Sequence, residues 1–550
     1  MVTSDNVNCS LAGQFVLQEG GNAIDAAITT TFCLALVQPH ITGIGGGGLM
    51  LIHSHRKNTS TVVDFREVAP QNARNDRYIQ NPLSASFGRK SVGVPGFVKG
   101  LEHAFQKYGS GHIGLTCCSW TDLIRKAITE ALRSVQVSDH FLNATQTKIS
   151  QSELDSPDAT LLKYVLPSYI VIKCSYIYQL SFRQLVESAQ LGKRLTDIPI
   201  FMALVKTLKS IAVNGSASIY EGGEVGQSII KALGGAITVE DLANYTVKER
   251  TPLTTMIGQH EVMVSPSPSS GPELLALLNS FSYLKEQLKS SFGVVTADYL
   301  HSLANVLQNL EDLQLGLGDA DANADQDKKQ ENMLDKSNAP QWTSDIQKEN
   351  VFDPSYALSD PVASNVAVMD KKDNYVSVVT SLNTWFGSKV MTSSGILLNN
   401  AIANFAIPNE SGELETFNQL AEGRRPLTSN VVALSMDTRD ICGTRIVTGG
   451  ATASSVGQVL AFPLLLNSDL RSSVDAARID VQNSTVFLEN TDVRGSFTAK
   501  VVSDFLQRED DVNFMKIPFT PVNALEKTID QPISIDDSRS GGSDSDEHFF

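Results

Sequence analysis

The chain has 550 residues, of which 42% are hydrophobic and 19% are charged. This length and composition are typical of a soluble globular protein with a substantial core, and they exclude a marginal mini-domain. The formal net charge of −16 excludes a basic phosphate-binding surface, so we expect no nucleic-acid partner.

The N-terminal part predicts a helix, a glycine-rich turn and two strands. An alanine-rich helix runs from Gly20 to about Leu36, and Pro39 follows its end. Four glycines, Gly45 to Gly48, precede apolar strands at Leu49–His53 and Thr61–Phe65. The order helix, loop, strand, without a following Lys-Ser or Lys-Thr, excludes a phosphate-binding loop. Close backbone packing at a turn explains the glycines better.

Further helices and strands alternate along the rest of the chain. Helices are expected from Gly96 to Tyr108, from Trp120 to Val135, twice within 219–250, and after the Ser265–Pro272 loop. Alternating apolar residues predict strands within Val366–Val379 and at Ile446–Thr448.

Three segments do not fit this pattern. Residues 164–182 are strongly apolar and aromatic, but a proline and polar residues make them a poor membrane span. They are a lineage-specific insertion, an unspliced piece of the gene, or a buried strand pair. The acidic stretches 311–353 and 536–550 predict a solvated linker and a disordered tail.

Cysteines and glycosylation sequons bear on the compartment. The six cysteines have no zinc-site spacing, so we predict no metal and no cofactor. Seven Asn-x-Ser/Thr sequons agree with a secretory route: Asn8, Asn58, Asn143, Asn214, Asn244, Asn409 and Asn483. No signal peptide or membrane anchor precedes the first helix, so we expect a truncated or a cytosolic chain.

Seven motifs together resemble gamma-glutamyltransferases (glutathione hydrolases). They are GGNAIDAA at 20–27, TGIGGGG at 42–48, DFREVAP at 64–70, SVGVPG at 91–96, SLNTWFGS at 381–388, SGILLNN at 394–400 and RRPLTS at 424–429. The resemblance implies an α+β fold, namely a four-layer αββα N-terminal-nucleophile hydrolase sandwich from one precursor cut into two interlocked parts. The large-subunit-like part is 1–362 and the small-subunit-like part is 363–535.

The resemblance also implies a disulfide and a location. Its animal members carry a disulfide at positions that match Cys9 and Cys33, although two buried thiols remain an alternative. Animal members are anchored on the extracellular face of the plasma membrane, which implies the secretory pathway for this chain.

The nucleophile position departs from the family. The family's catalytic threonine falls at Ala363, and a methyl group cannot attack a carbonyl. Ser364 is the alternative nucleophile, but a slip of one residue along a strand turns its side chain to the opposite face. The Ala-Ser-x-Val pattern at 363–366 resembles the divergent gamma-glutamyltransferase 7 type.

Five other residues match substrate-binding positions of the family. Arg66 matches the arginine that holds the substrate carboxylate with a bidentate fork. Asn383 matches an amide near the ammonium group, and Ser381 a hydroxyl that supports the nucleophile. Thr428 and Ser429 match a serine pair near the carboxylate. The alternative is polar scaffolding with no ligand.

Other site positions have changed. Ala401 and Asn404 stand where the resemblance implies acceptors for the ammonium, and Thr452 and Ala453 stand at the oxyanion glycines. A small shift in the match to the family would place Gly449-Gly450 at the oxyanion positions instead.

We therefore hold three hypotheses about function. The first is an impaired or inactive homologue that binds at most glutathione, glutamate or another gamma-glutamyl compound. The second is an active hydrolase or transferase that uses Ser364 after self-cleavage. The third is a non-catalytic protein with a protein partner.

Overall fold

The computed structural model describes most of the chain. The described residues are 1–79, 81–110, 118–133, 138–147, 194–289, 295–319, 321, 324–344, 361–407, 417–440, 443–482, 485–489, 497–507, 512–515, 520–528 and 531–540. The apolar segment expected at 164–182 lies outside these residues.

The first sheet has six antiparallel strands, which combine segments from the N-terminal part of the chain with segments near residues 364–381. Its order is β1 (Val2–Ser4), β7 (Ser364–Met369), β8 (Asn374–Ser381), β2 (Gly47–Ser54), β3 (Thr59–Asp64) and β4 (Lys248–Arg250). Ser364 pairs with Thr380, and Gly47 pairs with Ser381. The glycine-rich turn therefore lies beside the end of β8, close to where β7 begins.

The second sheet also has six antiparallel strands. Its order is β15 (Gln531–Ile535), β14 (Ala524–Thr528), β10 (Arg445–Gly450), β9 (Val431–Asp437), β6 (His260–Val264) and β5 (Leu253–Ile257). A small third sheet contains β11 (Ile479–Gln482), β12 (Thr485–Glu489) and β13 (Val512–Met515).

The two large sheets pack face to face. Apolar side chains of both inner faces form one buried cluster, including Leu49, Leu51, Ala367, Val379, Val432 and Val447. Alternate residues of each strand therefore point inward to this cluster and outward to a helical layer.

One helical layer covers the outer face of the first sheet. Its helices are α1 (Val7–Gln18), α2 (Ala23–Val37), α5 (Phe97–Tyr108), α6 (Trp120–Ala131), α7 (Asp139–Thr147), α9 (Pro199–Asn214), α10 (Ala217–Tyr220), α11 (Glu224–Leu233) and α12 (Val239–Asn244). The short helices α3 (Asp76–Ile79) and α4 (Leu83–Ser86) pack instead in a small separate cluster with Ile402 and Phe405. Every residue of α2 is buried. Its N-cap Asn22 and Asp25 form a capping box that satisfies the first backbone donors.

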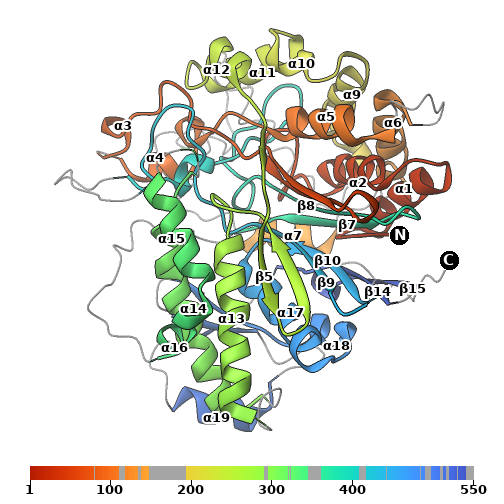
Figure 1. The fold of residues 1–550 in the computed structure, drawn as a ribbon. Helices are drawn as coiled ribbons and strands as arrows, with labels where there is room; N and C mark the ends of the chain where they lie inside the picture. The colour runs from red at the N-terminus through yellow and green to blue at the C-terminus, as the bar shows by residue number, and fades with distance from the viewer. Residues whose placement is uncertain are drawn as a thin grey trace.

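A second helical layer covers the other sheet. Its helices are α13 (Gly271–Leu288), α14 (Ala297–Leu315), α15 (Ala324–Leu334), α16 (Ala339–Trp342), α17 (Ala453–Leu466), α18 (Leu470–Asp475) and α19 (Ala499–Leu506). Figure 1 shows these green and blue helices on the opposite side of the sheets from the red and orange helices α1, α2, α5 and α6. The α+β, four-layer αββα architecture predicted from the motifs is confirmed.

The expected acidic linker at 311–353 is wrong over its described residues. Glu311 lies in α14, and α15 and α16 follow. Met333, Ala339 and Trp342 are buried in the core of the second helical layer. These few apolar residues anchor a segment whose average composition is polar, so composition alone misjudged it.

The expected disordered tail begins too early at 536. Asp537 and Arg539 are buried, and Arg539 Nη1 lies 3.0 Å from Asp537 Oδ1. Arg539 also binds both carboxylate oxygens of Glu489, and Asp537 pairs with Arg478. Because each buried charge has an opposite partner, residues up to 540 belong to the fold.

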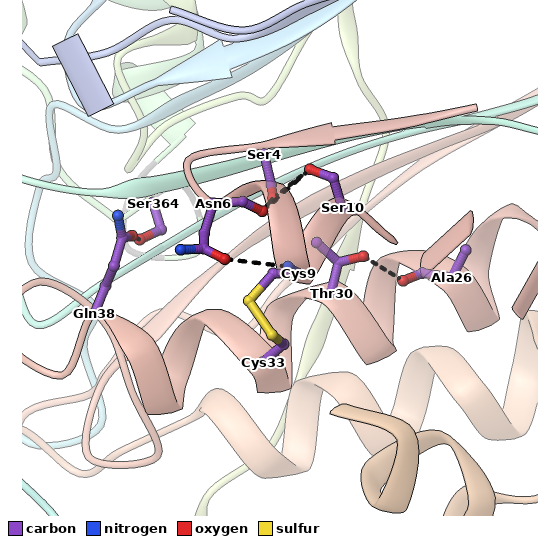
Figure 2. The surroundings of a disulfide bond; sticks show 9 residues. All are labelled: Ser4, Asn6, Cys9, Ser10, Ala26, Thr30, Cys33, Gln38 and Ser364. Atoms are coloured by element: carbon purple, nitrogen blue, oxygen red, sulfur yellow. Dashed lines mark hydrogen bonds between the residues drawn. A yellow bond between two sulfur atoms is a disulfide. The ribbon is translucent and has the colours of Figure 1, made fainter. Parts of the chain in front are cut away.

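The structure pairs Cys9 of α1 with Cys33 of α2 in a disulfide (Figure 2). Both residues are fully buried. Near this bond Asn6 caps α1 by accepting a hydrogen bond from the backbone nitrogen of Cys9 at 3.2 Å. The bridge therefore fixes α1 against α2, the helix that packs on β7 and β8.

Candidate functional site

Ala363 and Ser364 lie at the start of β7 and point to opposite faces of the first sheet. Ala363 is 4% exposed and belongs to the cluster between the two sheets. The hydroxyl of Ser364 donates a 2.8 Å hydrogen bond to Oε1 of Gln38, which follows α2 (Figure 2). The structure therefore places Ser364 on the helical side of the sheet, away from Ala363.

Ser381 holds the peptide group that precedes Ala363. Its hydroxyl donates to the carbonyl oxygen of Val362 and accepts a 2.7 Å hydrogen bond from the backbone nitrogen of Asn383. The backbone nitrogen of Val362 in turn donates to the carbonyl oxygen of Asn383 at 3.3 Å. The chain entering β7 is thus fixed against the chain leaving β8.

The guanidinium group of Arg66 is 2% exposed and already has protein partners. Nη1 donates to Glu67 Oε2 at 2.7 Å, and Nη2 donates to Asn383 Oδ1 and to the carbonyl oxygen of Leu427, both at 3.1 Å. Nε donates to the carbonyl oxygen of Pro426 at 3.5 Å. These bonds use four of the five N–H donors of the side chain.

Asn383 and Asn404 form a reciprocal amide pair. Asn383 Nδ2 donates to Asn404 Oδ1 at 2.9 Å, and Asn404 Nδ2 donates to Asn383 Oδ1 at 2.7 Å. Asn404 Nδ2 also donates to the carbonyl oxygen of Leu427 at 3.0 Å. An aspartate at 404 has no N–H to donate, so this closed arrangement depends on the amide. The neighbouring Ala401 is fully buried.

Buried charges support the segments that carry Arg66 and Leu427. Although burial alone would raise it, the guanidinium groups of Arg425 and Arg250 hold the pKa of the Asp64 carboxyl below its usual value. Asp64 Oδ2 lies 2.7 Å from Arg250 Nε, and its Oδ1 accepts from the backbone nitrogen of Arg66 at 3.0 Å. Burial raises the pKa of the Glu67 carboxyl, against the opposing effect of Arg66.

Of the other residues predicted from the sequence, one makes only a local structural contact, and three line a pocket. The hydroxyl of buried Thr428 accepts from the backbone nitrogen of Asn430 at 3.2 Å, which is a local turn contact. Ser429, Thr452 and Ala453 line a pocket beside the N-terminus of α17, together with Pro361. Thr452 caps α17 by accepting from the backbone nitrogen of Ser455.

Gly449 and Gly450 do not replace Thr452 and Ala453. Both glycines lie within β10, where they pair with Val432 and Val431 of β9. The carbonyl oxygen of Gly449 also accepts a hydrogen bond from Asn365. The alternative match considered from the sequence would therefore put the oxyanion glycines inside a strand, whereas Thr452 and Ala453 lie at the N-terminus of a helix.

Sequence reasoning missed part of this site. The carbonyl groups of Pro426 and Leu427 and the carboxylate of Glu67 complete the surroundings of Arg66, and only Glu67 is adjacent in sequence. The same pocket is also lined by the acidic residues Glu273 of α13, Glu311 of α14 and Asp480 of β11, which sequence reasoning missed because they come from three separate elements. Among the described residues, no group of three or more His, Cys, Asp or Glu side chains is placed to hold a metal ion.

Comparison with known sequences identifies relatives over nearly the whole chain. The family model for gamma-glutamyltranspeptidase matches residues 9–546. Glutathione hydrolase 7 of Mus musculus is 30% identical over 511 residues, which cover 89% of this chain and 71% of that protein. Glutathione hydrolase 2 of Arabidopsis thaliana is 31% identical over 503 residues, covering 87% and 79%. Scoloptoxin SSD14 of Scolopendra dehaani is 28% identical over 504 residues, covering 88% and 81%.

Comparison with solved structures supports the architecture. A cephalosporin acylase from Bacillus halodurans superposes with a TM-score of 0.75 at 18% identity, covering 98% of this chain and 94% of the acylase. At this identity the likeness bears on the fold alone. In the part of the chain that the structure describes, no helix is both long and apolar enough to cross a membrane.

Proposed function

The chain belongs to the gamma-glutamyltranspeptidase family, and from this premise we propose that it is an uncut member that does not hydrolyse or transfer gamma-glutamyl groups through residue 363. The observation that carries the proposal is the pair of neighbouring positions 363 and 364. Ala363 offers only a methyl group, and the Ser364 hydroxyl is bound to Gln38 on the other face of the sheet.

The missing hydroxyl affects two steps of the chemistry that the family resemblance implies. In self-cleavage, a hydroxyl at 363 would attack the carbonyl carbon of Val362 and release the nitrogen of residue 363 as an amine, and water would then hydrolyse the resulting ester and cut the chain. In turnover, the same oxygen would attack the gamma-carbonyl of the substrate, with the freed amine as base. Ala363 supports neither step. The Ser381 hydroxyl still hydrogen-bonds the Val362 carbonyl, so the surroundings of the cleavage point remain.

An active enzyme that uses Ser364 needs a different local backbone. Moving the Ser364 side chain to the inner face requires a register shift in β7, which pairs with both β1 and β8. The shift also leaves the buried Gln38 amide without its hydroxyl partner. Both costs oppose this alternative.

Binding of a gamma-glutamyl compound is the part of the family's function that the retained residues support. Arg66 is the feature that favours it, because a guanidinium fork fits a carboxylate. A ligand carboxylate must displace Glu67 or the carbonyl groups that now bind Arg66. Because Asn404 and Ala401 supply no charged acceptor, each lost bond to the ligand ammonium costs roughly 1.5–3 kcal/mol. We therefore expect weak binding.

The test of cleavage compares wild type with Ala363→Thr and Ala363→Val. Threonine and valine add similar volume at this buried position, but only threonine adds a hydroxyl. On denaturing gels we expect wild type and the valine variant to stay whole. We expect the threonine variant to yield fragments of about two thirds and one third of the 59.5 kDa chain. A wild-type chain cut with Ser364 at the new N-terminus would overturn the proposal.

The test of binding titrates glutathione and glutamate into wild type and Arg66→Lys by calorimetry. Lysine keeps the charge but loses the bidentate fork. Binding that disappears in the lysine variant supports a gamma-glutamyl site at Arg66. Equal binding in both proteins contradicts that site, and no binding in either favours a non-catalytic protein with a protein partner.

We also propose an oxidising, extracytosolic compartment. The Cys9–Cys33 disulfide supports it, because disulfides are rare in the cytosol. The sequon asparagines Asn58, Asn214 and Asn244 are exposed and open to glycan transfer. Protein from secretory cells should shift in mass after glycosidase treatment, and protein without any shift would contradict this assignment.

A further inference from the structure

Two histidines meet between α7 and the end of α2, outside the site described above. His40 follows α2 and is fully buried, whereas His140 lies at the start of α7 and is half-buried. Nε2 of His40 lies 3.1 Å from Nδ1 of His140, which is a hydrogen-bond distance. The other ring nitrogen of His40, Nδ1, is buried and has no hydrogen-bond partner among the described residues.

Aromatic side chains surround this pair. The His40 ring stacks on Phe141 of α7, with centroids 4.6 Å apart, and on Trp385, with centroids 5.9 Å apart. The centroid of the His140 ring also lies 5.0 Å from that of Trp385. Phe141 is fully buried and Trp385 is 7% exposed. The helix α7 is therefore docked on Trp385 through a stack of rings, two of which can take up a proton.

The hydrogen bond between the two rings restricts their protonation. A neutral imidazole has one N–H group and one lone pair, so one ring donates and the other accepts. If both rings are protonated, two N–H groups face each other at the same distance. A proton on His40 also creates a buried N–H group at Nδ1, for which the described residues supply no acceptor. The docked geometry therefore excludes the doubly protonated pair.

The surroundings of the pair also disfavour charge. Burial lowers the pKa of His140 to about 4, and burial together with the charge of His140 lowers the pKa of His40 well below its usual value. No carboxyl group of the described residues affects either ring. The side chains that α7 and the neighbouring loop present to the pair, Phe141, Trp385 and Phe386, do not ionise. Both imidazoles are therefore neutral at pH 7 while α7 is docked.

The loop 382–389, on which α7 docks, has a strained backbone. Three of its non-glycine residues have positive φ angles: Asn383 (87°), Phe386 (61°) and Lys389 (60°). The backbone nitrogen of Phe386 donates a 2.8 Å hydrogen bond to the carbonyl oxygen of His40, which joins the loop to the histidine pair. Such a backbone persists only where its surroundings enforce it. The docking of α7 on His40 and Trp385 therefore helps to hold Asn383 in place.

We propose that α7 is an acid-released latch on the loop 382–389, which stays docked while His40 and His140 are neutral and is released when both take up protons. Release uncovers Trp385 and removes one restraint on Asn383, whose side-chain amide is hydrogen-bonded to Arg66 and Asn404. The latch does not depend on the proposed loss of catalysis, because neither histidine takes part in the chemistry at residue 363.

The size of the effect follows from proton binding. In the released state each histidine regains an ordinary pKa of about 6.5, so both are largely protonated below about pH 5.5. The docked pair stays neutral until the pH approaches 4, the pKa of docked His140. Between pH 5.5 and 4.5 release therefore takes up two protons, and its equilibrium constant should rise about a hundredfold per pH unit. Docking is strongest above about pH 7 and weakens as the pH falls.

The test measures hydrogen exchange of the full-length protein from pH 7 to pH 4.5, with protection factors corrected for the intrinsic pH dependence of exchange. Protection of α7 should fall about a hundredfold between pH 5.5 and 4.5. His40→Gln combined with His140→Asn puts uncharged amides at the two facing nitrogens and should abolish this fall. His140→Asn alone should reduce it to about tenfold. His103→Gln, at a half-exposed histidine of α5, is the matched control and should keep the full fall.

Three results would overturn the proposal. The first is constant protection of α7 over this pH range, and the second is the same fall in wild type and in the double variant. The third is a simultaneous loss of protection in α2 and β8, which would show acid unfolding of the whole protein instead of release of α7. If the double variant does not fold, His140→Asn at the half-buried position replaces it, and an undiminished fall in that variant refutes the role of the pair.

Discussion

Asp5 should make the stability of this protein depend on pH near neutrality. It is 3% exposed and follows β1. Oδ2 accepts from the backbone nitrogen of Asn365 at 3.1 Å, and Oδ1 accepts from Asn523 Nδ2 at 2.5 Å. Burial is the largest influence and raises the pKa of the Asp5 carboxyl from 3.8 to about 7, although hydrogen bonding to Asn365, Asn523 and Ser364 opposes it. The perturbation that isolates this effect is Asp5→Asn.

The sign follows from proton binding. Between pH 4 and pH 7 the folded protein keeps the Asp5 proton while the unfolded chain has released it, so stability falls as pH rises. A shift of about three pKa units at 1.36 kcal/mol each gives a loss of about 4 kcal/mol over this window. Above about pH 7 both states are ionised and the loss is complete. The side-chain amide of the variant does not ionise in this pH range. The difference in unfolding free energy between wild type and the variant therefore reports the ionisation of Asp5.

The assay is urea unfolding of wild type and Asp5→Asn at pH 5, 6, 7 and 8. The stability of wild type relative to the variant should fall by about 1.4 kcal/mol per pH unit up to pH 7 and then level off. The lost hydrogen bond in the variant shifts the whole difference curve without changing its slope. Asp327→Asn, at an exposed residue of α15, is the control, and its difference in unfolding free energy from wild type should not change with pH. A flat difference for Asp5→Asn would refute the reasoning.

Three further predictions concern stability and are checked by denaturant unfolding. Cys33→Ser removes the disulfide that closes the 24-residue span from Cys9, and should lower the free energy of unfolding by about 3 kcal/mol. A reductant should destabilise only wild type, and an equal response of both proteins would contradict the disulfide. Arg250→Met removes an ion-pair partner from fully buried Asp64 and should cost about 3–5 kcal/mol, whereas a cost below about 1 kcal/mol would mean that the remaining partner suffices. Trp342→Ala should cost about 3–5 kcal/mol because the side chain is 4% exposed, and a negligible cost would mean that the acidic segment does not contribute to the core.

The fold was largely predictable because its local signals agree. The alanine-rich helix expected at 20–36 is α2, and the strands expected at 49–53 and 61–65 match β2 and β3 to within two residues. The pairing of β1 with β7 was not predictable from either strand, since hydrophobic alternation identifies a strand but not its neighbour. The family motifs implied the layered architecture, but not this pairing.

The candidate site was predictable only as a set of residue types. The motif containing Arg66 identified the guanidinium group. It did not show that the backbone carbonyl oxygens of residues 426 and 427 accept hydrogen bonds from that group. Backbone acceptors have no sequence signature. The acidic pocket was also invisible, because Glu273 in a first helical turn has an ordinary interpretation as a helix-dipole partner. Only the tertiary fold brings it close to Glu311 and Asp480.

The mixing of early and late strands in the first sheet has a consequence for synthesis on the ribosome. Val2 pairs with Val368, so β1 has no partner until about two thirds of the chain has been made. At 5–20 residues per second this delay is roughly 20–70 s. During the first part of that time β2 and β3 have only each other, because β4, β7 and β8 are still to be made. The nascent chain therefore exposes unpaired strand edges, and its yield should depend on chaperones that cover such edges.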